Sequence, residues 1–369
     1  MRVRALSIHA DYGCRDSGAC CRAGWDIAVE PEIEAGLNAA VARGALPADP
    51  AWARPLAGLP HGARVVLRVS PAGECVFHEP RACAVHTHLG AQALPSACRQ
   101  FPRVASLTPL GVSVTLSHYC PTAAGLLFRD EPSLAVVEEP AAFPASWPFE
   151  GLDAREAFPP LLRPGVLASW PFLARFEAHA VATLADGEAP EAALASLAAT
   201  AERLRAWSVS DGPFDAFADG VLGNGEKAPA ASPQPIEAAV AEWERAAASV
   251  PAAELVPPSP TSIGDLARLS DRVDGGWQRL QAPVRRWLAA KAFGSWVALQ
   301  GDGVRTTVAS LRQALGVLRA EAVRGCAEAG RELDAPLLAE SFRRADLLLL
   351  HLADVQALAR GLSRCEIAG

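Results

Sequence analysis

Cysteine is concentrated at the start of this chain. Seven of the nine cysteines lie within the first 120 of its 369 residues, and three of them belong to the stretch CRDSGACC that begins at residue 14. Thiolates repel one another, so in a reducing compartment many of them meet mainly where a soft cation such as zinc or iron neutralises them. The candidate metal ligands are Cys14, Cys20, Cys21, Cys75, Cys83, Cys98 and Cys120.

Core packing and disulfide formation account for these seven cysteines less well than metal binding does. A single buried cysteine is ordinarily a small core residue, which is our interpretation of Cys326 and Cys365. A disulfide framework belongs to oxidising compartments, and the start MRVRALSIHADYGC has no apolar stretch of the kind that directs secretion. We therefore expect a cytoplasmic protein whose first seven cysteines bind metal.

The flanks of these cysteines support the same prediction. Proline and glycine in SPAGEC, HEPRAC and LPSACRQFPR allow loops to converge on a point. Nearby cations can donate to thiolate or sulfide, and nearby imidazoles can serve as further ligands or donors. These residues are Arg81, Arg99, Arg103, His86, His88 and His118.

The number of cysteines exceeds what one site needs, because zinc and a [4Fe–4S] cluster each take four protein ligands. The spacings match neither a zinc ribbon nor a ferredoxin run. The residues with the best-matching flanks are Cys21, Cys75, Cys83 and Cys98, which we predict to form one set. The remaining three, Cys14, Cys20 and Cys120, would then complete a second site or line the first.

The fold class predicted from the pattern is mainly α. We expect a loop-rich cysteine domain with a small β element over residues 1–130, a proline-rich connector over 131–151 and a helical domain over 152–369. Strands are expected only in the first third of the chain, as ARVVLRVS and GVSVTLS, which would pair as a short hairpin or ribbon near the cysteines. Helices are expected at 171–186, 190–207, 236–250, 280–298 and 336–361.

One further helix has the clearest pattern. An apolar stripe runs from Val304 to Cys326, and Arg305, Arg312, Arg319 and Glu321 lie off it, as in an amphipathic helix of about six turns.

Composition excludes two classes of partner. The net charge of −7 and the pI near 5.7 argue against a nucleic-acid partner. No apolar run reaches the roughly 18 residues that span a bilayer, so we expect no membrane partner.

The cysteine motifs resemble those of a known family. CRDSGACCRAGWDI, CVFHEPRACAVHTHLGAQALPSACRQFPR and LSHYCPTAAGLL are similar, as an ordered set, to the cysteine-cluster proteins described as zinc- or iron-chelating. Within that group the sequence is most similar to the flagellin lysine-N-methylases. The resemblance covers about a third of the chain, and the helical remainder is similar only loosely.

The resemblance implies an iron–sulfur cluster, [4Fe–4S] in type, or zinc, and methyl transfer from S-adenosylmethionine to lysine side chains of a flagellin-like protein substrate. A lysine must lose a proton before it attacks a methyl sulfonium, so the site needs desolvation or a base. Tyr12 and Tyr119, the only tyrosines, are the catalytic candidates, and the alternative, which the residues alone favour, is that their rings shield the metal loops. Trp25, Arg99 and Arg103 are the cofactor-binding candidates.

Two alternatives to the enzyme stay open. The chain could be a non-catalytic module that stores, senses or delivers iron or zinc, or its metal could serve only to connect loops that lack a core. No Gly-rich dinucleotide-binding motif follows a strand, so any methyl donor is expected at or near the cluster.

Overall fold

The computed structural model describes residues 2–47, 49, 51–80, 82–129, 134–186, 189–224, 233–251, 259 and 266–365. The chain forms two compact units. The smaller unit comprises residues 13–104 and 120–122, and the larger unit comprises residues 1–12, 105–119 and 123–369. This division differs from the expected boundary near residue 130, because the chain enters and leaves the smaller unit twice.

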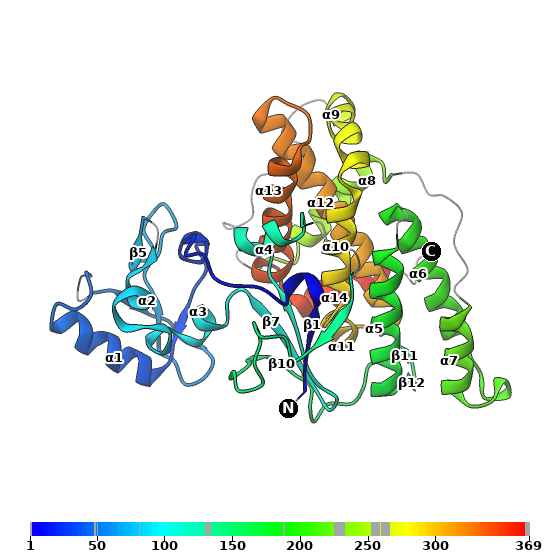
Figure 1. Ribbon diagram of the computed structural model, residues 1–369, viewed down its shortest axis with the longest axis horizontal. Coiled ribbons are helices and arrows are strands. Elements are labelled where there is room, and N and C mark those ends of the chain that lie inside the picture. Colours follow the sequence, from blue (N-terminus) through cyan, green and yellow to red (C-terminus); the bar gives the residue numbers. More distant parts are fainter. Residues whose placement is uncertain are drawn as a thin grey trace. The chain divides into compact units, whose positions relative to one another are not determined.

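The smaller unit consists of short elements joined by loops (Figure 1). Strands β2, β4 and β3 form one antiparallel sheet, and β5 and β6 form a hairpin. Its core gathers Leu37 from helix α1, Val85 from helix α2, and Trp52 and Phe77 from the loops that precede β3 and β5. The elements are η2 (Ala19–Arg22), β2 (Ala28–Val29), α1 (Pro31–Ala42), β3 (Ala53–Pro55), β4 (Val65–Leu67), β5 (His78–Glu79), β6 (Ala82–Cys83), α2 (Ala84–Leu89), η3 (Ala91–Ala93) and α3 (Ser96–Gln100).

The larger unit contains a five-stranded sheet of order β10-β7-β8-β1-β9 among the described residues. Its strands are β1 (Val3–Leu6), β7 (Arg103–Thr108), β8 (Gly111–Leu116), β9 (Val136–Glu138) and β10 (Gly151–Asp153). Strand β1 pairs parallel with β8 and antiparallel with β9. The pairing places both the start of the chain and the expected connector in the larger unit.

The two predicted strands do form, as β4 and β8, but the prediction that they pair as a hairpin is wrong. Strand β4 pairs with β2 and β3, whereas β8 lies between β7 and β1. The expectation that strands are confined to the first third is also wrong, since β9, β10, β11 (Leu161–Arg163) and β12 (Val166–Leu167) follow it. Backbone pairing between distant segments decided the first of these outcomes, and local pattern does not encode it.

Helices make up most of the larger unit, so the prediction of a mainly α protein is confirmed. The predicted helices at 171–186, 190–207 and 236–250 correspond to α5 (Trp170–Ala185), α6 (Pro190–Arg205) and α8 (Ile236–Ala247). Ser169 caps α5, and proline at the first turn starts α5 and α6. The other elements are η1 (Ser7–His9), α4 (Pro121–Leu126), η4 (Val209–Asp211), α7 (Phe214–Gly223), α9 (Leu266–Arg279) and α11 (Val297–Gln300).

Helix α12 (Val304–Ala329) lies at the centre of the helices and contacts α6, α8, α9 and α13. The predicted stripe is buried, and Cys326 is a core residue as expected. Arg319 and Glu321, which lie off the stripe, are buried as well. Glu321 accepts a hydrogen bond of 2.6 Å from Trp243 on α8, and Arg319 pairs with Asp274 on α9, so packing on both sides encloses this helix.

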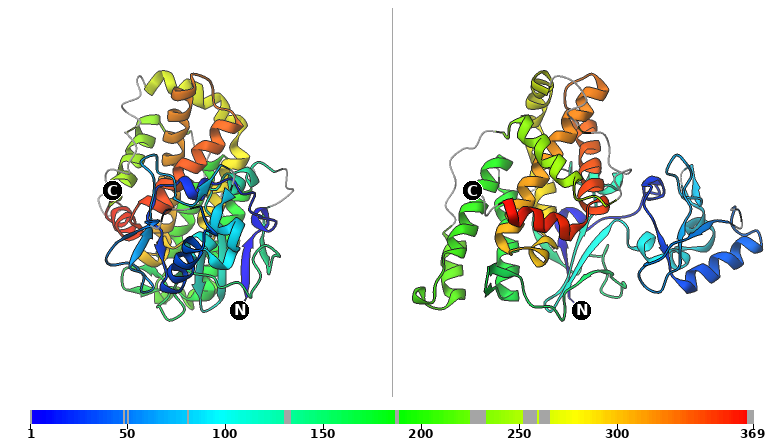
Figure 2. Two further views of the ribbon diagram at one scale, coloured as in Figure 1. Left: turned by 90° about the vertical axis from the view of Figure 1, so that its left-hand side faces the viewer. Right: turned by 180° about the vertical axis from the view of Figure 1, so that it is seen from behind.

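Two predicted helices are shorter than expected. The helix predicted over 280–298 ends as α10 (Gln281–Ala292), where Gly294 has a φ of +67°. The helix predicted over 336–361 is divided into α13 (Ala335–Asp346), a π-helix η7 (Leu347–Leu352) and α14 (Val355–Cys365). Figure 2 shows α14 beside α11 in the larger unit. The side chain of Cys365 lies outside the described residues.

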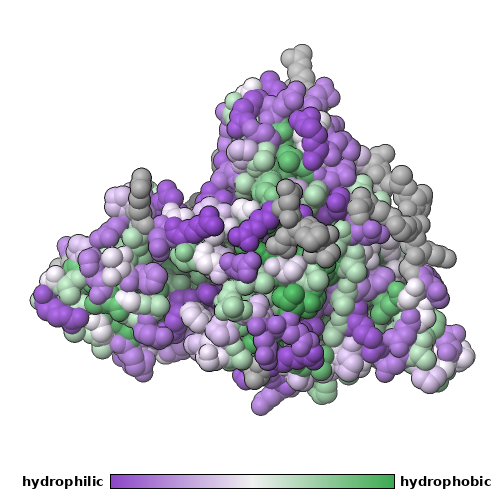
Figure 3. Space-filling view, viewed as in Figure 1, coloured by the Kyte–Doolittle hydropathy of each residue, from purple (hydrophilic) through white to green (hydrophobic). Residues whose placement is uncertain are grey.

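In the part of the chain that the structure describes, no helix has both the length and the hydropathy needed to cross a membrane. On the face of the molecule drawn in Figure 3, hydrophilic and hydrophobic residues are interspersed.

Candidate functional site

All seven predicted cysteine ligands belong to the smaller unit. Glycine at position 18 adopts a φ of +66° and starts η2, which carries Cys20 and Cys21. The backbone N–H of Cys75 donates to the carbonyl of Cys21 over 2.7 Å and holds these two segments together. Cys83 ends β6 at the N-cap of α2, and Cys98 lies in α3. Cys120 belongs to the separate segment 120–122, so five segments bring cysteines into this unit.

Five of these cysteines interact with one another. The Cys21 thiol hydrogen-bonds to the thiols of Cys20 and Cys83. Cys75 and Cys98 lie close enough to Cys20 and Cys83 for their charges to interact. None of these cysteines is in a disulfide. We call this group, Cys20, Cys21, Cys75, Cys83 and Cys98, the thiol cluster.

Of the remaining two cysteines, Cys14 lies beside the thiol cluster and Cys120 lies beside Cys14. Cys14 is exposed and interacts electrostatically with Cys120 and with Cys20. Its thiol also lies 3.7 Å from a carboxylate oxygen of Asp16. The structure therefore groups Cys20 with the predicted set of four and leaves Cys14 and Cys120 outside it.

The thiol cluster has an uneven distribution of protons. The hydrogen bond with Cys21, together with the backbone N–H groups of His86 and Val85 at the start of α2, outweighs burial and lowers the pKa of Cys83 to about 6. The hydrogen bond with Cys21 also lowers the pKa of Cys20. The hydrogen bonds with Cys20 and Cys83 raise the pKa of Cys21 itself. Burial raises the pKa of Cys75 to about 11 and raises that of Cys98 strongly. A positive charge bound among them would favour the thiolate form of all five.

No group of three or more His, Cys, Asp or Glu side chains within the described ranges has the arrangement that holds a metal ion. The predicted accessory histidines have acidic partners, although His86 also interacts electrostatically with Cys83. His86 lies 3.8 Å from Asp16 and His88 lies 3.8 Å from Glu79, each forming a loose ion pair when protonated. His118 belongs to the larger unit. The thiols are gathered, but any metal would have to draw them into its coordination shell.

The cofactor-binding candidates also lie in the smaller unit. The ring of Trp25 contacts that of Phe101, with 5.6 Å between centroids. Arg99 follows Cys98 in α3, and Arg103 begins β7; both side chains are half-buried. Arg81 lies outside the described residues.

The two tyrosines are buried in the larger unit. The Arg343 guanidinium lies 5.3 Å from the ring centroid of Tyr119 and donates from Nε to the Tyr119 carbonyl over 3.0 Å. The His351 ring meets the Tyr119 ring edge-on at 6.2 Å. Tyr119 thus borders a group of buried polar residues that the sequence patterns did not indicate.

This group centres on Asp346, the last residue of α13, which is fully buried. One carboxylate oxygen accepts from the His118 backbone N–H (2.6 Å) and from its Nδ1 (3.2 Å). The other lies 2.5 Å from the Lys291 ammonium and 3.1 Å from the Trp287 indole nitrogen. We call Asp346, His118, Lys291, Trp287 and His9 the buried charge cluster.

Two histidines extend this cluster. The Nε2 atoms of His9 and His118 are 3.3 Å apart. Because His118 uses Nδ1–H toward Asp346, its Nε2 accepts and His9 donates, which leaves His9 Nδ1 without a hydrogen-bond partner among the described residues. His351, placed by the π-helix η7, lies 2.6 Å from the Ser117 hydroxyl.

Burial controls ionisation in this region. It lowers the pKa of His9, of His118 and of Lys291, and it lowers the pKa of His351 to about 4. Burial acts to raise the pKa of Asp346, but the Lys291 charge and the His118 hydrogen bonds hold it well below its usual range. The cluster therefore contains one carboxylate, one ammonium and neutral imidazoles near pH 7.

Sequence reasoning did not find His9, Lys291, Asp346 or His351, since they are scattered over some 340 residues of chain without a shared motif. No protein family, curated protein or solved structure was found to match this chain.

Proposed function

We propose that the smaller unit is a metal centre in which the thiol cluster binds an iron–sulfur cluster or zinc. The observation that carries this proposal is the convergence of five free thiols from four chain segments. Such a gathering is unfavourable for thiolates alone, and a soft cation offsets it.

The chemistry of the donors fits either metal. Zinc and a [4Fe–4S] cluster each take four thiolates, so the five thiols supply a full set and one further residue. Cys14 lies beside this set and Cys120 lies beside Cys14, where they would line the centre or contribute to a second one. Bound metal would also stabilise a unit whose helices and strands are short, because ligand bonds replace core burial.

The more specific proposal is that the chain is a protein-lysine N-methyltransferase that uses S-adenosylmethionine on a flagellin-like substrate. It rests on the ordered motifs that resemble the flagellin lysine-N-methylases, several of which surround the thiol cluster. The requirement on the chain's own residues is to exclude water from the lysine amine and to take up its proton. Tyr12 and Tyr119 are the proposed residues, and both are buried.

Metal analysis tests the first proposal. Anaerobically purified protein should contain iron with acid-labile sulfide, or zinc, in stoichiometric amount. Cys98→Ser and Cys83→Ser should each lose most of it, whereas Cys326→Ala, which changes a buried cysteine of α12, should keep it. Wild-type protein that stays metal-free after anaerobic reconstitution with iron, sulfide or zinc would refute the metal centre.

Calorimetry with S-adenosylmethionine tests the second proposal. Metal-loaded protein should bind the cofactor and transfer methyl groups to lysines of purified flagellin. A fully loaded protein that binds no S-adenosylmethionine would instead leave a non-catalytic module for iron or zinc.

A further inference from the structure

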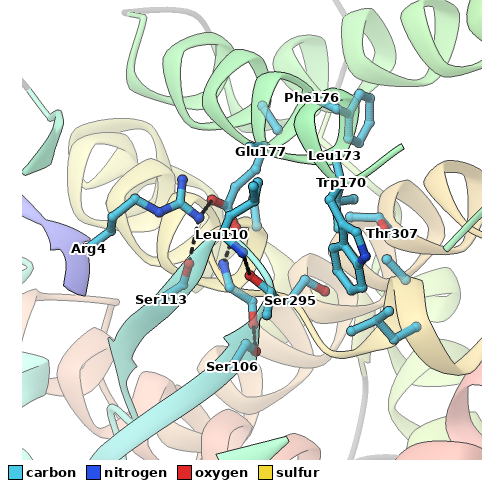
Figure 4. A pocket seen from close by; sticks show the side chains of 17 residues that line it. Arg4, Ser106, Leu110, Ser113, Trp170, Leu173, Phe176, Glu177, Ser295 and Thr307 are labelled. Atoms are coloured by element: carbon cyan, nitrogen blue, oxygen red, sulfur yellow. Dashed lines mark hydrogen bonds and ion pairs between the residues drawn. The ribbon is translucent and has the colours of Figure 1, made fainter. Parts of the chain in front are cut away.

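A small cavity lies in the larger unit, where three strands of the sheet meet helix α5 and the loop between α10 and α11 (Figure 4). Its volume is about 40 Å³. That space holds a few water molecules or the last few heavy atoms of an extended group, and it is too small for a whole cofactor.

The cavity has a polar side and an apolar side. Arg4, Ser113 and Glu177 lie on one side, and Trp170 and Phe176 lie on the other (Figure 4). The remaining wall is built largely from alanine and leucine side chains, among them Ala174, Ala180, Leu173 and Leu299. A ligand that fits must therefore combine a short apolar stem with one polar end.

The hydrogen bonds of the polar side leave one acceptor oxygen without a donor. The Ser106 hydroxyl donates to the Gly294 carbonyl (2.8 Å), and the Gly294 N–H donates to Glu177 Oε2 (2.7 Å). Arg4 donates to the Ser113 hydroxyl (2.8 Å). Glu177 Oε1 is buried and has no hydrogen-bond partner among the described residues. The ligand must therefore supply a donor.

The charges of the polar side restrict that donor further. Arg4 Nη2 lies 3.2 Å from Glu177 Oε1 as an ion pair without the alignment of a hydrogen bond. Within the described part of the chain, Arg4 and Glu177 are the only charged residues lining the cavity, so its net charge is already close to zero. His179, two residues further along α5, does not line it. A second buried cation would be uncompensated, whereas an uncharged N–H donor would not.

We infer that this cavity binds the end of a primary aliphatic amine in its uncharged form, with the amine donating to Glu177 Oε1 and the alkyl stem lying along Trp170 and Leu173. That the amine is a lysine side chain of a protein substrate rests on the proposed function. An uncharged amine is also the form that can accept a methyl group, so the cavity would hold the nucleophile once its proton has been taken up.

The test uses n-butylamine as the probe on the full-length protein, with binding measured by ligand-observed NMR titration. Since only the uncharged amine binds and an alkylamine has a pKa near 10.4, affinity should rise about tenfold for each pH unit between pH 7 and pH 9. Methyl propyl ether, which has the same number of heavy atoms and no donor, should not bind detectably. An affinity that is flat or falls over this pH range would refute the inference.

Variants provide the second arm. Glu177→Met should weaken butylamine at least tenfold, and Ala174→Leu should abolish binding by filling the cavity without a change of charge. Glu202→Met on α6, which removes a carboxylate paired with Arg305 instead of Arg4, should leave the affinity unchanged. If Glu177→Met fails to fold, the Ala174→Leu variant provides the test. Unchanged butylamine binding by Ala174→Leu would refute the inference.

The test of the amine site and the test of the proposed function can fail independently. Butylamine should bind equally to metal-free and metal-loaded protein, because the cavity belongs wholly to the larger unit. Butylamine binding without any methyl transfer would refute only the methyltransferase. Methyl transfer by a protein that binds no butylamine would refute only the amine site.

Discussion

Changing Asp346 to asparagine removes the negative charge at the centre of the buried charge cluster. Four N–H groups point at this carboxylate: the backbone and Nδ1 of His118, the indole of Trp287 and the ammonium of Lys291. Asparagine keeps one oxygen and presents an NH₂ group to donors on its other side. The Lys291 ammonium, nearly buried, is then left without its counter-charge.

The expected loss of stability is large. Removing one partner of a buried ion pair costs about 3–5 kcal/mol, and each buried donor left without an acceptor costs about 1–3 kcal/mol more. These contributions overlap, so we expect a total of about 4 kcal/mol. That is a substantial part of the roughly 5–15 kcal/mol by which a protein domain is stable. Urea unfolding followed by far-ultraviolet circular dichroism measures it on the helices of the larger unit.

Two control variants separate the effect of the buried charge from that of losing a carboxylate. Asp215→Asn removes an exposed carboxylate paired with Arg175 at 2.6 Å and should cost less than about 1 kcal/mol. Adding Lys291→Met to Asp346→Asn should recover about 2 kcal/mol, because the uncompensated ammonium is removed. A cost below about 1 kcal/mol for Asp346→Asn, or no recovery in the double variant, would contradict this account of the cluster.

Three further predictions concern stability. His351 has a pKa of about 4 in the folded protein against 6.5 unfolded, so its neutral form contributes stability that is present above pH 6.5 and is lost as pH falls toward 4. Over this range the free energy of unfolding of the wild-type protein should fall by roughly 2–3 kcal/mol more than that of His351→Asn. Gly303→Ala should destabilise the protein far more than Gly212→Ala in thermal unfolding. Both glycines have positive φ, but a Cβ at 303 would lie 1.4 Å from the Leu161 carbonyl oxygen, whereas the space at 212 is open. Equal shifts in Tm would count against a steric cause. Leu318→Ala, at a fully buried position of α12, should cost about 2–5 kcal/mol in urea unfolding, and a negligible cost would show that α12 is not the centre of the core.

The part of the candidate site that could be predicted from sequence is the cysteine set. Cysteine is rare and reactive, so seven residues close together in sequence form a recognisable signal without any knowledge of the fold. Their grouping could not be predicted, because it depends on contacts such as the backbone hydrogen bond between Cys75 and Cys21. That bond joins segments more than 50 residues apart, and it brings Cys20 together with the other four.

The buried charge cluster and the amine cavity had no local signal. Arg4 and Glu177, or His9 and Asp346, are separated by more than 170 residues and become neighbours only after β1 pairs with β8 and the helices pack. Likewise, the sequence pattern places Arg319 and Glu321 off the apolar stripe of α12 and gives no partner for either. They are buried because α8 and α9 supply Trp243 and Asp274 as partners.

The sequence by itself determined the positions of α5, α6, α8 and α12 and the separation of a cysteine-rich first third from a helical remainder. Helical periodicity, capping residues and composition act over a few neighbouring residues, and these features can be recognised without a fold. Only the tertiary structure decided that β1 belongs with the helices, that the predicted strands lie in different sheets and that a π-helix follows Asp346. Those outcomes depend on free energy gained between segments distant in the chain, which no local pattern contains.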